Sequence, residues 1–279
     1  MVDGLLINAA VISLTLLVLW QVAARIGDVS FIDAVWGAGM ALLAAVSWVQ
    51  LANPGPRAGL IAAMALIWGT RLGLHLYTRW CAHGEDPRYA RMLGKAREQG
   101  RYARAALTVV FAPQAVLLFI TSLPAQLGVL ASGAPAAIGP LAWAGFALWL
   151  VGMVFETVGD AQLKAFRADP ASKGKVLDSG LWRYTRHPNY FGDACVWWGI
   201  WLAAAEAGYG VALASLIGPI FLTFTLTKWS GKPLLEKGLA RTRPGYADYV
   251  ARTSGPLTCT KIRQKHVARM VECQLCVMP

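Results

Sequence analysis

The stretch Leu181–Gly199 reads LWRYTRHPNYFGDACVWWG and joins a basic, turn-forming half to an apolar, aromatic half. The first half contains Arg183, Arg186, His187 and Asn189, and the second half runs directly into a hydrophobic segment. Polar groups at the mouth of a membrane helix are costly unless they bind something charged. We therefore expect this stretch to bind the phosphates and the ribose of a nucleotide.

The composition around this stretch is that of a membrane protein. The 279 residues are 56% hydrophobic and only 15% charged, and 12 of them are Trp. Soluble domains seldom reach these values. Because each membrane-spanning helix needs about 20 residues, one bundle of about seven helices would use nearly the whole chain. The expected fold is therefore an all-α, polytopic membrane helix bundle.

Seven apolar runs predict the membrane spans, at residues 5–24, 33–52, 58–80, 106–130, 138–163, 191–207 and 209–229. The first run is too long for a signal peptide and lacks its basic start, so we interpret it as a span. Lys and Arg concentrate in the segments 79–104, 164–186 and 228–279, which alternate with loops that carry almost none. This distribution predicts an outside N-terminus and a cytoplasmic C-terminus. Because the basic residues follow this alternating pattern, the net charge of +11 does not indicate a nucleic-acid partner.

We expect one transmembrane domain over residues 1–254 and assign no role to the tail at 255–279. The tail contains the sequence CQLC, with Cys273 and Cys276, and His266 lies nearby. One such pair without a second is a weak signal for zinc, and no HExxH motif occurs, so no metal site is predicted. The chain also lacks GxGxxG and GxxxxGK[ST], which excludes a soluble dinucleotide fold and a P-loop.

Ionisable residues within the apolar runs are functional candidates because each is costly at membrane depth. Asp33 begins the second run in the sequence FIDAVWG, and we leave open whether it is a helix cap or an active-site acid. Trp36 lies one turn later on the same face. Arg71, His75 and Arg79 recur every four residues and so form one stripe on the third run. Arg71 needs an anionic partner, His75 is also compatible with an ordinary core hydrogen bond, and Arg79 with snorkelling.

The segments after the third and within the fifth run add more charge. Tyr77, on another part of the third helix, is a phenolic donor, and GEDPRY at Gly84–Tyr89 is either a self-contained salt-bridged loop or a lid. The end of the fifth run and the residues just after it place four charged residues on one helix face: Glu156, Asp160, Lys164 and Arg167. The two acids precede the predicted membrane exit, where a salt bridge in solvent is not expected. Arginine suits phosphates, and Asp or Asn suits hydroxyls and amides.

With RHPNYFGD at the entrance of the sixth run, the chain resembles the membrane-embedded steroid 5α-reductase-like superfamily, and its bacterial branch in particular. FIDAVWG, GEDPRY and PGYADY (Pro244–Tyr249) add to the resemblance, which covers roughly residues 28–254. It implies an inner-membrane reductase that binds NADPH from the cytoplasm and a lipophilic substrate from the bilayer. RHPNY also resembles membrane methyltransferases, so S-adenosylmethionine-dependent methyl transfer is the alternative. A transporter is a third possibility.

The resemblance implies roles for particular residues. Asp160 and Arg167 match the polar face that holds the nucleotide. Asn189 and Asp193 match a segment that approaches the nicotinamide, and Tyr246 matches an aromatic residue beside the cofactor. The expected cofactor-binding set is completed by Arg79, Lys164, Arg183, Arg186, His187 and Tyr190. Glu156 stands where the steroid enzymes usually have Asn, which leaves its role open.

The implied reaction is hydride transfer from NADPH to the β-carbon of an α,β-unsaturated carbonyl. The steroid enzymes hold the carbonyl with a Gln-Glu pair and a Tyr, and the second run of this chain lacks that pair. Asp33 is therefore the expected catalytic acid and Tyr77 or His75 the second donor, with Trp36 and Arg71 at the substrate. The methyltransferases typically carry a Glu-Glu pair after the last span. Here that stretch reads GKPLLEKG, with Glu236 alone, which favours the reductase.

Overall fold

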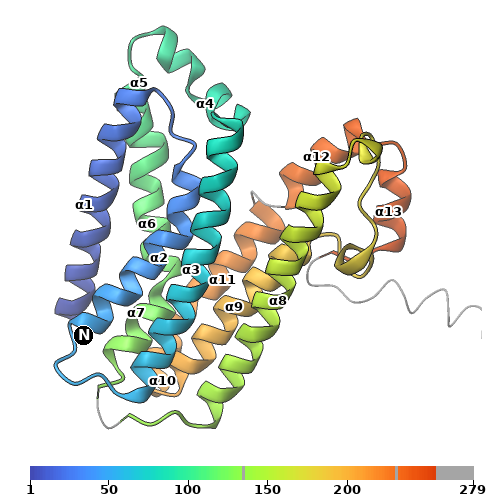
Figure 1. The fold of residues 1–279 in the computed structure, drawn as a ribbon. Helices are drawn as coiled ribbons and strands as arrows, with labels where there is room; N and C mark the ends of the chain where they lie inside the picture. Colours follow the sequence, from blue (N-terminus) through green and yellow to red (C-terminus); the bar gives the residue numbers. More distant parts are fainter. Residues whose placement is uncertain (134–135, 230–231, 256–279) are drawn as a thin grey trace, which may run out of the picture. The chain divides into compact units, whose positions relative to one another are not determined.

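The structure is a computed structural model that describes residues 1–133, 136–229 and 232–255 (Figure 1). The described chain consists of helices without β-strands, which confirms the all-α prediction. The helices are α1 (Val2–Ile26), α2 (Ile32–Val49), α3 (Pro56–His83), α4 (Pro87–Glu98), α5 (Tyr102–Ala105), α6 (Ala112–Thr121), α7 (Leu123–Leu130), α8 (Pro140–Ala168), α9 (Pro188–Ala205), α10 (Tyr209–Ser215), α11 (Ile217–Phe224), α12 (Lys232–Thr242) and α13 (Tyr246–Arg252). Two π-helical segments, Ala106–Phe111 and Thr225–Trp229, precede α6 and follow α11.

Two compact units make up the chain. The first contains Met1–Trp149 and Trp197–Phe221, and the second contains Leu150–Val196 and Leu222–Pro279. Within the first unit, α2 packs along α3, and α1 packs against α2 and α6 (Figure 1). Between α3 and α5, the polar segment Pro87–Glu98 forms the short helix α4.

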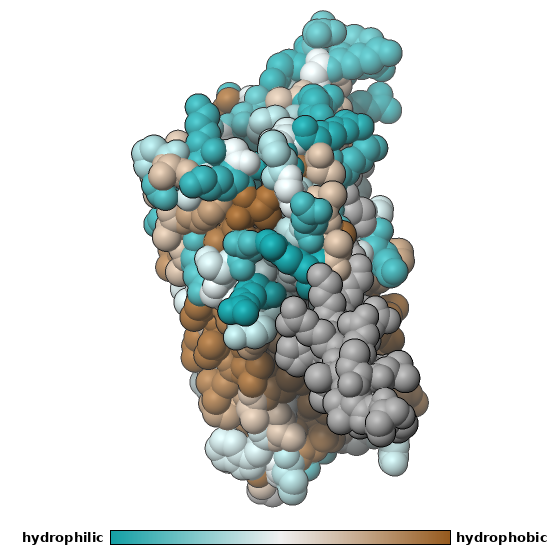
Figure 2. All heavy atoms as spheres, turned by 90° about the vertical axis from the view of Figure 1, so that its right-hand side faces the viewer, coloured by the Kyte–Doolittle hydropathy of each residue, from teal (hydrophilic) through white to brown (hydrophobic). Residues whose placement is uncertain are grey.

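Six segments among the described residues are long and apolar enough to cross a membrane: α1, α2, α3, Tyr102–Thr121, α8 and Tyr209–Trp229. The predicted run 191–207 is helical as α9 but is not among the six. The polar Asn189 and Asp193 and three Trp residues lower its hydropathy. The count of seven spans and the orientation of the termini therefore stay predictions. On the face in Figure 2, hydrophobic side chains form a band, and hydrophilic side chains gather beyond its upper end.

Glycines set the closest helix crossings in each unit. In the first unit, Gly37 of α2 faces Gly69 of α3, and a Cβ on either residue would meet the carbonyl oxygen of the other. In the second unit, Gly152 of α8 and Gly192 of α9 are related in the same way. Small residues permit such close contact between membrane helices, and these glycines have that packing role at both crossings.

A buried network of uncharged polar side chains also joins helices of the first unit. The Asn8 amide donates to Ser47 Oγ over 2.7 Å and to Gln126 Oε1 over 2.9 Å. Gln50 Nε2 donates to Asn8 Oδ1 over 3.0 Å. Asn8, Ser47 and Gln126 are fully buried, so these bonds satisfy side-chain polar groups that would find no hydrogen-bond partner in lipid. The network holds α1, α2 and α7 together.

Candidate functional site

Asp33 is the centre of a hydrogen-bonded cluster in the first unit. It lies in the first turn of α2, whose N-cap residue is Phe31, so Asp33 is not the cap. Arg88 Nη2 donates to Asp33 Oδ2 over 2.7 Å, and the Tyr89 hydroxyl donates to Asp33 Oδ1 over 2.7 Å. The helix α4, which contains both donors, is thereby tied to the start of α2.

Arg88 also binds Asp86, which completes an ion-pair group around the GEDPRY loop. Arg88 Nη2 lies 2.9 Å from Asp86 Oδ2, and Arg79 Nη2 lies 3.7 Å from the same oxygen. Burial alone would raise the pKa of Asp86, but the hydrogen bonds and charge of Arg88 outweigh it and lower that pKa. The loop is therefore salt-bridged, but it is not self-contained, because Asp33 of α2 shares its arginine.

Tyr89 is the phenol of this cluster, and it was not among the predicted site residues. Its ring is buried, and Gln114 Nε2 approaches its hydroxyl at 3.4 Å. Trp36, a predicted substrate contact, donates its indole hydrogen to Gln114 Oε1. Burial, and then the negative charge of Asp33, raise the pKa of Tyr89 well above its ordinary value. The Tyr89 hydroxyl therefore keeps its proton at neutral pH.

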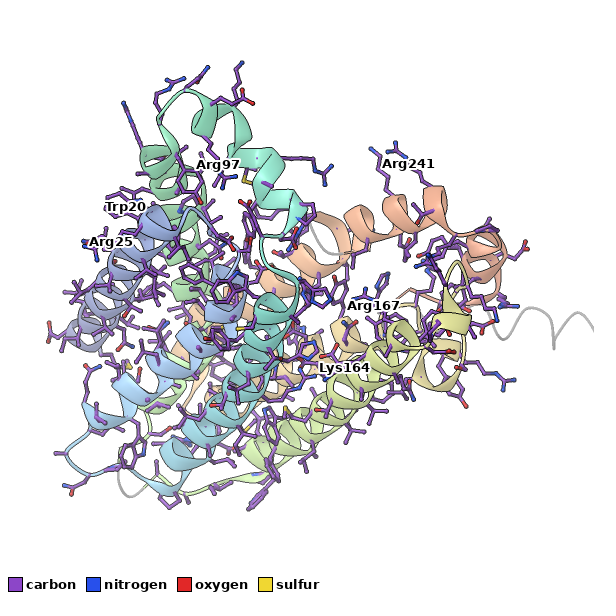
Figure 3. All side chains as sticks on the ribbon, turned by 45° about the horizontal axis from the view of Figure 1, so that its top comes forward. Trp20, Arg25, Arg97, Lys164, Arg167 and Arg241 are labelled. Carbon is purple, nitrogen blue, oxygen red and sulfur yellow. The ribbon has the colours of Figure 1, made fainter. Side chains whose placement is uncertain are left out.

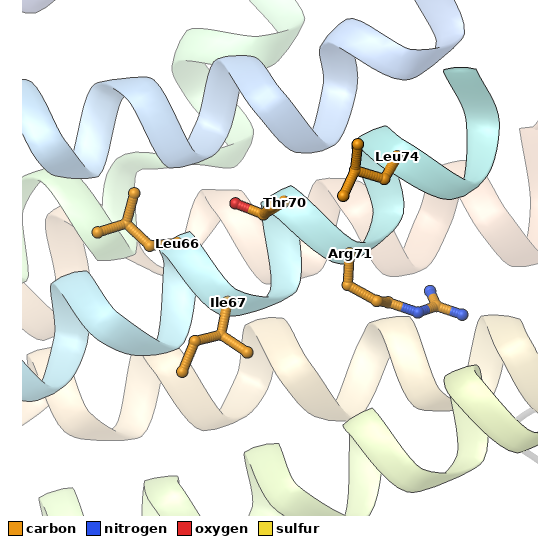
Figure 4. Close-up of a pocket in the computed structure, with 5 residues that line it drawn as sticks. All are labelled: Leu66, Ile67, Thr70, Arg71 and Leu74. Carbon is orange, nitrogen blue, oxygen red and sulfur yellow. The ribbon is translucent and has the colours of Figure 1, made fainter. Parts of the chain in front are cut away.

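The other predicted residues of the first unit lie along α3. Tyr77 is half exposed and packs on Trp80, with ring centroids 5.7 Å apart. Arg71 lines a shallow groove of about 430 Å³ with Leu66, Ile67, Thr70 and Leu74, and its guanidinium extends toward the C-terminal end of α3 (Figure 4). His75, one turn further along α3, is partly buried.

In the second unit, the structure brings Asp160 of α8 and Asn189 of α9 together. Asn189 Nδ2 donates to Asp160 Oδ1 over 3.3 Å. The helices α8 and α9 approach closely here because Gly159 has no Cβ. A Cβ at this position would lie 3.0 Å from the Pro188 ring. Glu156, one turn before Asp160, is buried, whereas Asp193 is partly exposed. The two residues predicted to contact hydroxyls or amides are thus neighbours, although 29 positions separate them in the sequence.

Arg186 and His187 share one acid, Glu236 of α12. Arg186 Nε lies 2.9 Å from Glu236 Oε1, and His187 Nε2 lies 3.0 Å from the same oxygen. Arg186 also donates to the backbone carbonyl oxygens of Thr253 and Val250. Both Arg186 and His187 are buried. Sequence reasoning did not find this role of Glu236, because the residue lies in a polar segment with no motif that points to a partner.

Three predicted cations of the second unit are exposed: Lys164, Arg167 and Arg183. Figure 3 shows Lys164 and Arg167 on the last turns of α8. Tyr190 stacks on the His187 ring, with centroids 5.1 Å apart and planes 9° apart. Tyr246 is buried, and burial followed by the charge of Glu236 raises its pKa to about 12. The three exposed cations are therefore accessible to a ligand from solvent, whereas the buried Tyr246 is not.

We predict that Glu236 stabilises the second unit only above acidic pH. Partial burial would raise its pKa, but hydrogen bonds from His187 and Arg186 outweigh it and lower the pKa from 4.5 to about 2. A lowered pKa in the folded state gives stability that is present above pH 4.5 and is lost as the pH falls toward 2. Allowing for solvent screening, Glu236→Gln should cost about 2 kcal/mol at pH 7. Thermal unfolding in detergent at pH 7 and at pH 3.5 measures this, and an equal loss at both pH values would contradict it.

Comparison with known proteins gives one family and several partial relatives. The family described as protein of unknown function (DUF1295) matches residues 19–253. The "3-oxo-5-alpha-steroid 4-dehydrogenase 1" of Mus musculus is 38% identical over 82 residues, 29% of this chain and 29% of that protein. The protein of the same name from Homo sapiens is 33% identical over 88 residues, 32% of this chain and 30% of that protein.

A relative named for a different activity matches about as well. The "Probable O-methyltransferase ustE" of Ustilaginoidea virens is 36% identical over 100 residues, 35% of this chain and 34% of that protein. The chain thus spans about a third or less of the length of these curated relatives. No solved structure matches the chain.

Proposed function

Because the chain belongs to the DUF1295 family of the steroid 5α-reductase-like superfamily, we propose that it is an NADPH-dependent membrane reductase. Its substrate is a lipophilic molecule with a C=C bond conjugated to a carbonyl. The partial similarity to 3-oxo-5-alpha-steroid 4-dehydrogenases supports an oxidoreductase in a membrane. We further propose a bacterial inner membrane, with the cofactor bound from the cytoplasm.

The observation that carries the proposal is the Tyr89–Asp33 hydrogen bond at 2.7 Å. The sequence predicted that Asp33 acts together with Tyr77 or His75. In the present proposal its partner is Tyr89, a buried phenol that keeps its proton. Asp33 holds the Tyr89 hydroxyl until the substrate binds; in the reaction the hydroxyl gives up this hydrogen bond and donates its one hydrogen to the substrate carbonyl, which stabilises the enolate oxygen that develops there. Asp33 positions the phenol, and Arg88 balances the charge of Asp33, 2.7 Å away.

The second unit contains groups that fit NADPH. Phosphates suit the exposed Lys164, Arg167 and Arg183, because guanidinium and ammonium groups bind them with charge-assisted hydrogen bonds. The ribose hydroxyls and the carboxamide suit the neighbouring Asp160 and Asn189, which offer both acceptors and donors. When bound, NADPH supplies the hydride. The chain orients it and excludes water from the reacting carbon.

A cofactor titration tests the proposal. We expect purified protein to bind NADPH with micromolar or tighter affinity, and Asn189→Ala or Arg167→Ala to weaken binding about tenfold, the cost of one charge-assisted or well-placed hydrogen bond. Arg25→Ala is the control, because Arg25 is an exposed cation at the end of α1, outside the proposed site. NADPH fluorescence and calorimetry both report the affinity.

The same titration tests the second candidate, a membrane methyltransferase. The similarity to the probable O-methyltransferase over 100 residues favours that candidate enough to test it. Tight binding of S-adenosylmethionine without any response to NADPH would reverse the assignment.

A further inference from the structure

We propose that Glu236 is a positioning residue of the cofactor site, which holds His187 and Arg186 so that the start of α9 is presented to NADPH. The inference rests on the proposed function, because it gives a task to a residue outside the expected cofactor set. Glu236 belongs to α12 and lies 49 residues after His187 in the sequence. The carboxylate therefore joins the C-terminal part of the second unit to the RHP turn before α9.

Charge and burial explain why Glu236 acts through its neighbours and does not bind the cofactor itself. A carboxylate repels phosphates, and a buried unpaired arginine is costly. The Arg186 side chain is 7% exposed, and its Nε lies 2.9 Å from Glu236 Oε1. Its guanidinium is further occupied by the carbonyl oxygens of Thr253 and Val250. Arg186 is thus part of a structural frame with Glu236 and the two carbonyl oxygens, and the proposed phosphate contacts are the exposed cations.

The same oxygen orients His187. Its Nε2 lies 3.0 Å from Glu236 Oε1, and because a carboxylate only accepts hydrogen bonds, Nε2 is assigned as the donor of this pair and Nδ1 is directed away from the acid. Parallel stacking on Tyr190 fixes the ring plane from a second side. His187 also precedes Pro188 and Asn189, whose amide reaches Asp160. A change at Glu236 therefore reaches Asn189 through only two residues, His187 and Pro188.

The C-terminal segment reinforces this frame at three other points. The Arg186 backbone N–H donates to the Ser254 carbonyl over 3.0 Å. The Tyr249 hydroxyl donates to the Trp182 carbonyl over 2.6 Å. Arg252 pairs with Asp178. Because these contacts remain when Glu236 is replaced, Glu236→Gln is expected to fold and to change the site locally.

The test combines NADPH affinity with a double-mutant cycle on the full chain in detergent. We expect Glu236→Gln and His187→Gln each to weaken NADPH binding about tenfold, because small misplacements of site groups have effects of this order or larger. The double variant should bind no more weakly than either single variant, since both changes remove the same contact. Asp248→Asn is the control, because it removes an exposed carboxylate from the same C-terminal region and should stay within about twofold of wild type.

Hydrogen exchange without cofactor provides an independent measurement. We expect peptides that cover residues 183–192 to exchange faster in Glu236→Gln than in wild type and in Asp248→Asn. Unchanged affinity in Glu236→Gln, or additive losses in the double variant, would overturn the positioning role. If wild type binds no NADPH, the proposed function fails. Exchange then decides the remaining question: faster exchange at 183–192 supports Glu236 as the residue that orders the turn, and unchanged exchange overturns it.

Discussion

Replacing Tyr89 by Phe is expected to lower turnover about a hundredfold and to leave NADPH affinity within about twofold of wild type. The reason is that a donor aimed at a developing oxyanion typically contributes this much to rate. Tyr89 is positioned for that task by Asp33, at 2.7 Å, and burial together with the charge of Asp33 keeps its hydroxyl protonated. Removing the hydroxyl leaves the ring and its packing in place, so the loss should fall on the chemical step.

Asp33→Asn should show the same pattern of reduced turnover with retained cofactor binding. The change removes the charge that Arg88 balances and weakens the acceptor that holds the Tyr89 hydroxyl. Turnover is measured as NADPH oxidation with the α,β-unsaturated ketone on which wild-type protein is most active. Unchanged turnover would leave Asp33 with a purely structural role in tying α4 to α2.

Two further phenols supply the comparison for Tyr89. Tyr209→Phe is the matched control, because Tyr209 is exposed at the start of α10 and lies outside the proposed site, so wild-type turnover is expected. Tyr77→Phe tests the donor that the sequence predicted. A large loss in Tyr77→Phe with none in Tyr89→Phe would contradict the assignment and restore the original pairing with Asp33.

The contrast between these two tyrosines shows what the sequence could predict. Asp33 and Tyr77 were found because they lie in or beside apolar runs, where each polar group needs an explanation. Tyr89 lies 56 residues after Asp33 in a polar loop, and its contact depends on α4 returning to the start of α2. That return begins at Gly84, whose positive φ of 69° few other residues adopt. The loop was recognisable as a motif, but its partner was not.

The same limit applies to the second unit. The spacing of charges on α8 and the RHPNY motif predicted Asp160 and Asn189 as cofactor contacts, and the structure shows that these two side chains are hydrogen-bonded to each other. Arg186 was predicted to contact phosphate because guanidinium groups suit phosphates, and nothing in the sequence shows that this arginine is buried. Its partner in the structure, Glu236, is 50 residues away. Helix periodicity predicts the partners of a residue within one helix, whereas tertiary contacts between helices decide which cations remain exposed.

Gly69→Ala is expected to destabilise the first unit by about 2–3 kcal/mol, the cost of inserting a methyl group where no space exists. A Cβ at Gly69 would meet the carbonyl oxygen of Gly37 and the Cβ of Ala41, so α2 and α3 would have to separate. Membrane helices that cross at glycine gain their stability from this close packing, and lipid offers no hydrophobic compensation when it is lost. Thermal unfolding in detergent should show a clearly lower midpoint.

Gly94→Ala is the matched control for this prediction, because the same atom is added within a helix where it touches nothing. Apart from its chain neighbours and the nearby backbone of its own helix, no atom lies within 4 Å of a Cβ built at Gly94 of α4. Since Ala is favoured over Gly in a helix by about 1 kcal/mol, this variant should be as stable as wild type or slightly more stable. Gly152→Ala, at the α8–α9 crossing of the second unit, should repeat the loss seen at Gly69, because its Cβ would meet the Gly192 carbonyl oxygen and the Val196 backbone nitrogen. If Gly69→Ala and Gly94→Ala unfolded together, the close approach of α2 and α3 would not be a source of stability.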